Sequence, residues 1–152
     1  MTDIGYISLK NNQVIGVNNI PQLDYSAFFE LNLSLIKENA AIHCVSYFGV
    51  LSGNKVKLFC CMADDSTHLI YVSSSLINPH DELPSMTAKN HNFERFEREI
   101  HENFGVRYLD HPWLKPVRYP FNRFDKSQVI ENYPFYRVDS KELHEVGVGP
   151  IH

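Results

Sequence analysis

The chain has 152 residues, of which 43% are hydrophobic and 21% are charged, a composition typical of one globular domain with its own core. Its formal net charge of -4 at pH 7 gives no electrostatic reason to expect DNA or RNA as a partner. The N-terminal residues have no signal-peptide pattern and no apolar run reaches the roughly 18 residues of a membrane span, so we expect a cytoplasmic location.

The N-terminal region predicts a small β-hairpin followed by a helix. Residues 6–9 and 14–17 are strand-like and flank Asn11 and Asn12, which tolerate tight turns. Asp24 is suited to cap a helix over residues 24–39. The apolar residues of this helix recur at the spacing of one buried face. They are Tyr25, Phe28, Phe29, Leu33 and Ile36.

Three strand-like runs, at residues 42–51, 55–63 and 68–75, predict an antiparallel meander because turn-forming residues separate them. In the second run, apolar residues alternate with lysines, which predicts one buried face. The apolar residues are Val56, Leu58, Cys60 and Met62. Phe59 and Cys61 interrupt the polar side, so this strand is expected to be central. The predicted class is α+β, with a sheet of three or more strands covered by two main helices.

The second main helix is predicted at residues 90–104, where Phe93, Phe96, Ile100 and Phe104 form an apolar stripe. Gly105 is expected to end it in a left-handed conformation. Ser85, Thr87 and Asn90 remain alternative N-caps. Three ion pairs are expected at the four-residue spacing. They are Glu94 with Arg98, Arg95 with Glu99, and Arg98 with Glu102.

Glu97, Arg98 and Glu99 are consecutive, so their side chains point in three directions around this helix. One interpretation is an ordinary solvated face. The other is that at least one of the three holds the loop at residues 108–116 or meets a partner protein. The expected complements in that loop are His111 and Lys115 for the acids and Asp110 for Arg98.

Beyond Gly105 the sequence is rich in proline and has no helix or strand period until residues 135–138, which predicts an extended arm. Aromatic side chains in such an arm favour an interface with a partner protein, where they bury a large area. The alternative is that they only pack against their own domain. The arm residues expected at this interface are Trp113, Phe121, Phe124 and Tyr133.

The stretch FEREIHENFG, followed by HPWLKP, resembles the signature of the 30 kDa subunit of respiratory complex I. It resembles more closely the fused form of that subunit at the N-terminus of the large subunit of energy-converting nickel–iron hydrogenases, of the hydrogenase-4 or formate hydrogenlyase type. Arg95 and Asp110 depart from the usual pattern, and Glu102 keeps the acid of its position as Glu where Asp is usual. The matching signature positions are Glu97, Arg98, Glu99, Glu102, Phe104, Gly105, His111, Pro112, Leu114 and Lys115.

The resemblance implies a division of the chain. Residues 1–116 would form a domain like the 30 kDa subunit, and residues 117–152 an arm leading to the start of a large-subunit domain, like the 49 kDa subunit, that is absent. The final residues, HEVGVGPIH, resemble the junction with that domain, so we expect an excised N-terminal domain.

The resemblance also implies a non-catalytic structural module. Its partners would be the large catalytic domain, in the same polypeptide, and the iron–sulfur small subunit. It implies no cofactor in this chain, with iron–sulfur clusters and, for a hydrogenase parent, a nickel–iron site elsewhere in the complex. The location would be the cytoplasmic periphery of the inner membrane, reached only through the complex.

A different class of function is a small stand-alone enzyme. His101, Asp110 and His111 could supply acid–base chemistry if the loop folds back on the helix. The eight histidines include no metal-binding spacing, and no nucleophile or phosphate-binding motif accompanies them. This alternative requires the three side chains to converge in a pocket, whereas the structural module requires an exposed apolar surface along the arm.

Overall fold

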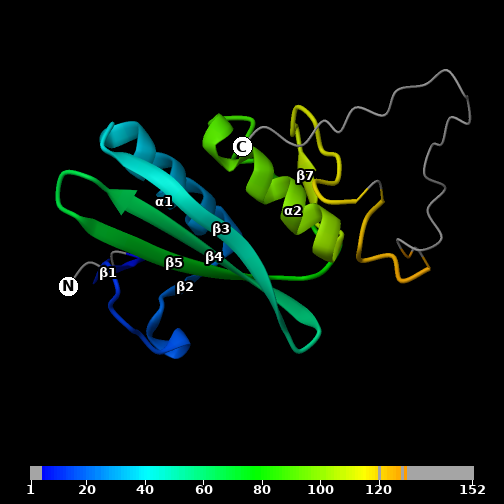
Figure 1. Ribbon diagram of the computed structural model, residues 1–152, viewed down its shortest axis with the longest axis horizontal. Helices are drawn as coiled ribbons and strands as arrows, with labels where there is room; N and C mark the ends of the chain where they lie inside the picture. The colour runs from blue at the N-terminus through cyan, green and yellow to red at the C-terminus, as the bar shows by residue number, and fades with distance from the viewer. Residues whose placement is uncertain (1–4, 120, 128, 130–152) are drawn as a thin grey trace, which may run out of the picture.

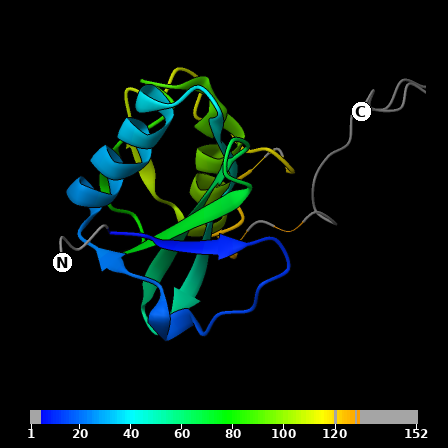
Figure 2. The same ribbon diagram turned by 90° about the vertical axis from the view of Figure 1, so that its left-hand side faces the viewer.

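A twisted five-stranded sheet carries both main helices on one of its faces (Figures 1 and 2). The computed structural model describes residues 5–119, 121–127 and 129. The strand order is β1–β5–β4–β3, and β2 pairs with β5 in parallel. The other neighbours are antiparallel, which confirms the predicted α+β class. The strands are β1 Ile7–Lys10, β2 Gln22–Leu23, β3 Ile42–Ser52, β4 Lys55–Asp64 and β5 Leu69–Ile77.

Strands β3, β4 and β5 form the predicted meander, with β4 at its centre. The four alternating apolar residues of β4 are fully buried between the sheet and the helices, as predicted. On the opposite face Phe59 is also buried and stacks on Phe48 with ring centroids 5.4 Å apart. The central strand is therefore covered on both faces.

Helix α1, Tyr25–Glu38, begins where predicted because the Asp24 side chain accepts a 2.9 Å hydrogen bond from the backbone N–H of Ala27. Its buried face is centred on Phe28 and Asn32. The Asn32 amide donates to the Phe28 carbonyl and to the Ser73 hydroxyl, and these bonds satisfy a polar group in the core. The other predicted apolar residues flank this centre and are partly buried.

The predicted N-terminal hairpin is wrong. β1 pairs with β5, while residues 14–16 are irregular and Val17–Asn19 forms the short 3-10 helix η1. Asn12 does adopt a turn conformation, with φ 65°, but the chain does not return as a strand. The edge of β5 offers β1 a longer backbone partner, and this pairing buries Leu9.

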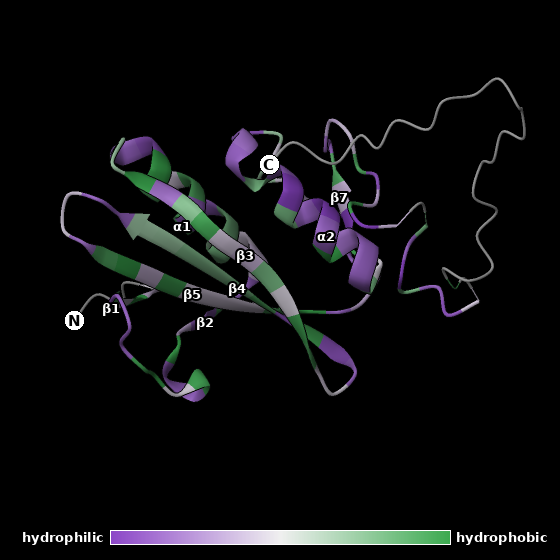
Figure 3. Cartoon of the chain, in the orientation of Figure 1, coloured by the Kyte–Doolittle hydropathy of each residue, from purple (hydrophilic) through white to green (hydrophobic). Residues whose placement is uncertain are grey.

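Helix α2, Glu94–Phe104, follows the 3-10 helix η2, His91–Phe93. Asn90 caps η2, and Gly105 ends α2 with φ 74°, as predicted. Phe93 and Ile100 are buried, whereas the other two stripe residues are partly buried. Most of the α2 ribbon has the hydrophilic colour in Figure 3, and no helix of the described residues is long and apolar enough to cross a membrane.

Of the three ion pairs expected on α2, Glu94 and Arg98 form one, at 2.6 Å. The expected pairs of Arg95 with Glu99 and of Arg98 with Glu102 are wrong, because Glu99 and Glu102 bind the chain that follows α2. Spacing along a helix identifies neighbours on that helix only.

Two three-residue strands, β6 Glu82–Pro84 and β7 Arg107–Leu109, pair in parallel beside α2. The expectation of no strand between Gly105 and residue 135 is therefore wrong. Strands this short show no recognisable alternation, and Pro84 argues locally against one. Their pairing brings together the segments that enter and leave α2.

Candidate functional site

The carboxylate of Glu97 lies fully buried at the junction of α2 with residues 85–87. One oxygen accepts a 2.7 Å hydrogen bond from the backbone N–H of Met86. The other accepts from the Ser85 hydroxyl at 2.6 Å, and from the Thr87 hydroxyl and N–H at 2.6 and 3.2 Å. We call Ser85, Met86, Thr87, Glu97 and His111 the Glu97 cluster. Thus Ser85 and Thr87, expected as alternative caps, bind this acid.

The His111 side chain closes the other side of the Glu97 cluster. Its Nε2 lies 3.9 Å from a Glu97 oxygen, and its Nδ1 accepts from the Trp113 backbone N–H at 3.1 Å. This acceptor role places the ring proton on Nε2, facing the carboxylate. Burial lowers the pKa of His111 and raises the pKa of Glu97, although the four hydrogen bonds of Glu97 act in the opposite direction.

Two buried tyrosines, Tyr47 and Tyr108, and the partly buried Tyr25 lie close to the Glu97 cluster. The Tyr47 and Tyr108 hydroxyls are 3.0 Å apart, and the Tyr25 hydroxyl donates to the Pro84 carbonyl at 2.8 Å. Burial is the main cause that raises the pKa of each, and the negative charge of Glu97 adds to it. These tyrosines therefore remain neutral, and they tie α1 to β6 and β3 to β7.

Arg98 holds the chain after the His111 loop from outside the core. Its guanidinium donates to the carbonyls of Lys115 and Pro116, at 2.8 and 3.2 Å, while it also pairs with Glu94. The same group lies 4.4 Å from the centre of the Trp113 ring. The expected complement Asp110 is not its partner. Arg98 therefore holds both the backbone of residues 115–116 and the Trp113 indole in place.

Glu99 and Glu102 bind the next residues of the chain. One Glu102 oxygen accepts from the backbone N–H groups of Val117 and Arg118, at 2.6 and 2.8 Å. The Arg118 guanidinium pairs with Glu99 at 2.7 Å. We call Lys115, Pro116, Val117 and Arg118 the arm base. Three charged side chains of α2 thus attach the arm base to the helix.

The chain returns to the end of α2 after the arm base. The backbone N–H of Phe124 donates to the Glu102 carbonyl at 3.1 Å, and the Phe124 ring meets the imidazoles of His80 and His101 edge-on. Gly105 leaves room for this contact, since a Cβ there would meet both Phe124 and His80. Glu102 therefore binds the chain at residues 117 and 118 through its side chain and at Phe124 through its carbonyl.

The remaining predicted residues fall into two groups. Phe104 and Leu114 pack against the core, and the Phe104 ring lies over Gly49 of β3. Trp113 is 55% exposed and has the Lys115 ammonium 5.9 Å from its ring, while Phe121 stacks on Tyr119. Tyr133 lies outside the described residues.

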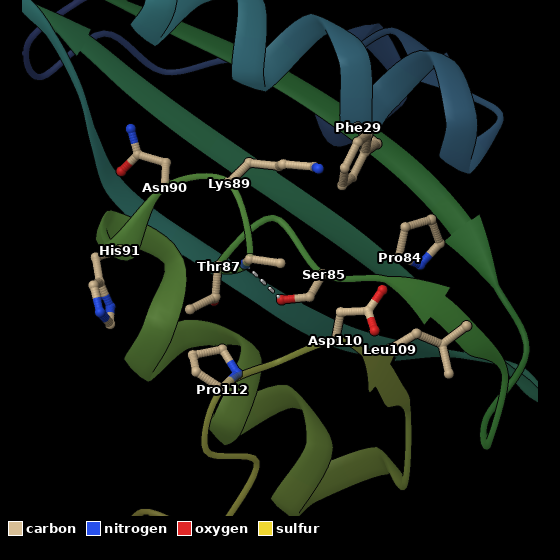
Figure 4. A pocket seen from close by; sticks show the side chains of 11 residues that line it. Phe29, Pro84, Ser85, Thr87, Lys89, Asn90, His91, Leu109, Asp110 and Pro112 are labelled. Atoms are coloured by element: carbon tan, nitrogen blue, oxygen red, sulfur yellow. Dashed lines mark hydrogen bonds between the residues drawn. The ribbon is translucent and has the colours of Figure 1, made fainter.

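A polar cavity of about 610 Å³ opens beside residues 84–91, between them and α1 (Figure 4). Asp110 and Pro112 line one side of it, and Lys89 and Asn90 lie across from them. The Ser85 hydroxyl accepts a hydrogen bond from the Ala88 N–H within the loop that forms its floor. His101 and His111 do not line this cavity.

The three residues of the acid–base hypothesis point to different partners. His101 Nδ1 bonds with the Val106 carbonyl at 2.8 Å, His111 faces Glu97, and Asp110 is exposed at the cavity rim with φ 61°. Within residues 5–119, 121–127 and 129, no hydrogen bond joins these three side chains, and no group of three or more His, Cys, Asp or Glu residues could hold a metal ion.

The family model described as "Respiratory-chain NADH dehydrogenase, 30 Kd subunit" matches residues 27–134, which is more than half of the chain. The matched span contains most of α1, strands β3 to β7, α2 and the arm base. A comparison with curated proteins gave no match.

Proposed function

This chain belongs to the 30 kDa subunit family of the respiratory-chain NADH dehydrogenase, and we propose that it is a non-catalytic assembly module of an oxidoreductase complex of that kind. In this role the module docks the large catalytic subunit and the iron–sulfur subunit. The signature residues of α2 then act by fixing the shape of the docking surface.

The observation that carries this proposal is the attachment of the arm base to α2. Arg98 and Glu102 hold its backbone, and Glu99 pairs with the Arg118 side chain. The Trp113 indole lies beside this backbone, exposed and stacked on a guanidinium. An aromatic anchor whose orientation is fixed before binding loses little conformational entropy on docking, as an assembly surface requires.

The finer proposal is that the parent complex is an energy-converting hydrogenase of the hydrogenase-4 or formate hydrogenlyase type. It rests on the resemblance of the signature and of the last nine residues to the fused large subunit. In that complex the iron–sulfur clusters and a nickel–iron site belong to the neighbouring domains. The module would sit at the cytoplasmic side of the inner membrane and reach the membrane only through its partners.

Replacing Trp113 with Ala in the complete complex tests the docking role. We expect the large and iron–sulfur subunits to co-purify with the Trp113→Ala chain at least about tenfold less well, because interface anchors of this kind contribute 1.4 kcal/mol or more. The melting temperature of the domain should change little, since the indole is half exposed. Val14→Ala is the control, because Val14 is 93% exposed and lies far from α2 in the sequence.

Two results would contradict the proposal. One is normal co-purification of both subunits with the Trp113→Ala chain. The other is turnover of a substrate by the domain alone that disappears in a His111→Gln variant, which would favour the acid–base enzyme.

A further inference from the structure

Among the described residues, strand β3 has a free edge along most of its length. It pairs with β4 alone, and within the described part of the chain no other hydrogen bond reaches the backbone of residues 46–52. Every second residue of an antiparallel edge strand directs its N–H and C=O away from its neighbour. These groups form a template for a further strand.

The β3 edge has little of the protection that edge strands commonly carry. Residues 42–52 include no Asp, Glu, Lys, Arg or Pro. The one irregularity is a register shift between Cys44 and Ser46, after which the pairing with β4 is regular to Ser52. Charges, prolines and bulges normally prevent edge-to-edge pairing, so residues 46–52 stay open to it.

The sheet face beside this edge is apolar and faces away from the helices. Phe48 and Val50 of β3 are 41% and 48% exposed, and Leu51 at its end is 65% exposed. They border a groove of about 430 Å³ whose lining includes Val17, Ile20, Phe59 and Val72. An exposed apolar patch continuous with an open strand edge is typical of a protein interaction surface.

We propose that the β3 edge at residues 46–52 binds an extended segment of a neighbouring subunit, which adds to the sheet as a further strand. Only the backbone of an extended chain can pair with the outward N–H and C=O groups at their spacing. The segment is uncharged where it pairs and apolar at alternate positions, because these side chains would lie beside Phe48 and Val50.

Membership in a family of complex subunits favours a neighbouring subunit over a second copy of this chain. The inference rests on that membership and not on the docking role of the arm. The edge and Trp113 are altered by different substitutions, so failure of one proposal can be told from failure of the other.

The probe is a synthetic peptide of alternating valine and threonine, as long as the 46–52 edge and flanked by lysines for solubility. Its control is the same peptide with N-methyl groups on alternate residues, which removes the N–H groups that would face β3. We expect the first peptide to slow hydrogen exchange of alternate amides in residues 46–52 about tenfold, and the methylated peptide to have no effect. Val50→Lys should weaken binding about tenfold, whereas Val14→Lys should not.

Equal binding of both peptides would overturn the proposal, because it would reflect the apolar groove and not the strand edge. Slow exchange of the edge amides without peptide would also overturn it, since a second copy of the chain or residues 130–152 would then occupy the edge. Sedimentation distinguishes these two cases, because only the first gives a dimer. If Val50→Lys prevents folding, the comparison of the two peptides on the unaltered protein still decides.

Discussion

The carboxylate of Glu97 and the hydroxyl of Ser85 lie 2.6 Å apart inside the core, where the start of α2 meets the loop before it. This bond is one of four that the same carboxylate accepts. A buried acid with four donors stabilises the fold only while every donor stays paired.

Glu97→Gln should therefore lower the free energy of unfolding by about 2 to 4 kcal/mol, because the amide directs an N–H group at donors that need an acceptor. Urea unfolding of the domain measures this. Glu99→Gln is the control, since Glu99 is partly exposed and pairs only at the surface, so its loss should stay below about 1 kcal/mol. Equal losses at the two positions would contradict the role assigned to Glu97.

The two central residues of the α2 stripe should differ in their contribution to stability. Ile100→Ala should cost about 2 to 5 kcal/mol, because Ile100 is buried, and Phe96→Ala should cost less, because Phe96 is partly exposed. Urea unfolding gives both values, with the exposed Arg95→Ala as reference. A loss below about 0.5 kcal/mol at both apolar positions would mean that α2 does not pack as described.

His111 should make the stability of the domain depend on pH. Burial lowers its pKa in the folded state below the ordinary value of 6.5, so the unfolded chain binds the proton first as the pH falls. Stability from the neutral ring is thus complete above pH 6.5 and is lost as the pH falls below it. Glu97 acts in the opposite direction, because its raised pKa favours the folded state at low pH and this contribution is lost as the pH rises.

Unfolding in denaturant between about pH 5 and pH 7.5 isolates the His111 contribution. The unaltered protein should lose stability relative to a His111→Gln variant as the pH falls, since Glu97 titrates in both. Parallel curves for the two proteins would show that His111 is not held neutral by the fold.

Glu102 should govern the order of the arm base. Glu102→Ala removes the acceptor of the Val117 and Arg118 N–H groups, so their amides should exchange about tenfold faster, which corresponds to about 1.4 kcal/mol of local stability. Hydrogen exchange measures this residue by residue. Glu99→Ala, which breaks only the side-chain pair with Arg118, should leave both amides nearly as protected as before.

The parts of the fold that sequence alone predicted are those set by neighbouring residues. The alternation in β4, the Asp24 cap and the left-handed Gly105 each depend on a few consecutive positions, and all three are confirmed. The partner of β1 depends on which strand offers a longer edge, and sequence alone does not reveal this. For the same reason, β6 and β7 went unpredicted.

The candidate site was predicted as a set of residues but not as a set of contacts. Ser85 and Thr87 have the side chains of helix caps, and the same hydroxyls can bind a carboxylate. Only the packing of their loop against α2 decides between these uses. The spacing of Arg98 and Glu102 predicted a pair between them, whereas the returning arm base supplies each with other partners.

The parallel pairing of β6 with β7 also has a consequence for how the domain opens. Because Glu82 lies opposite Arg107 and forms an ion pair with it, the two ends of the segment between them are held together. Separating β6 from β7 would leave α2 held by its buried residues and bonded to the arm base, so the helix and the arm base would move as one unit. Docking of the arm and the pairing of β6 with β7 are then thermodynamically linked. A partner that binds the arm base also favours this strand pairing.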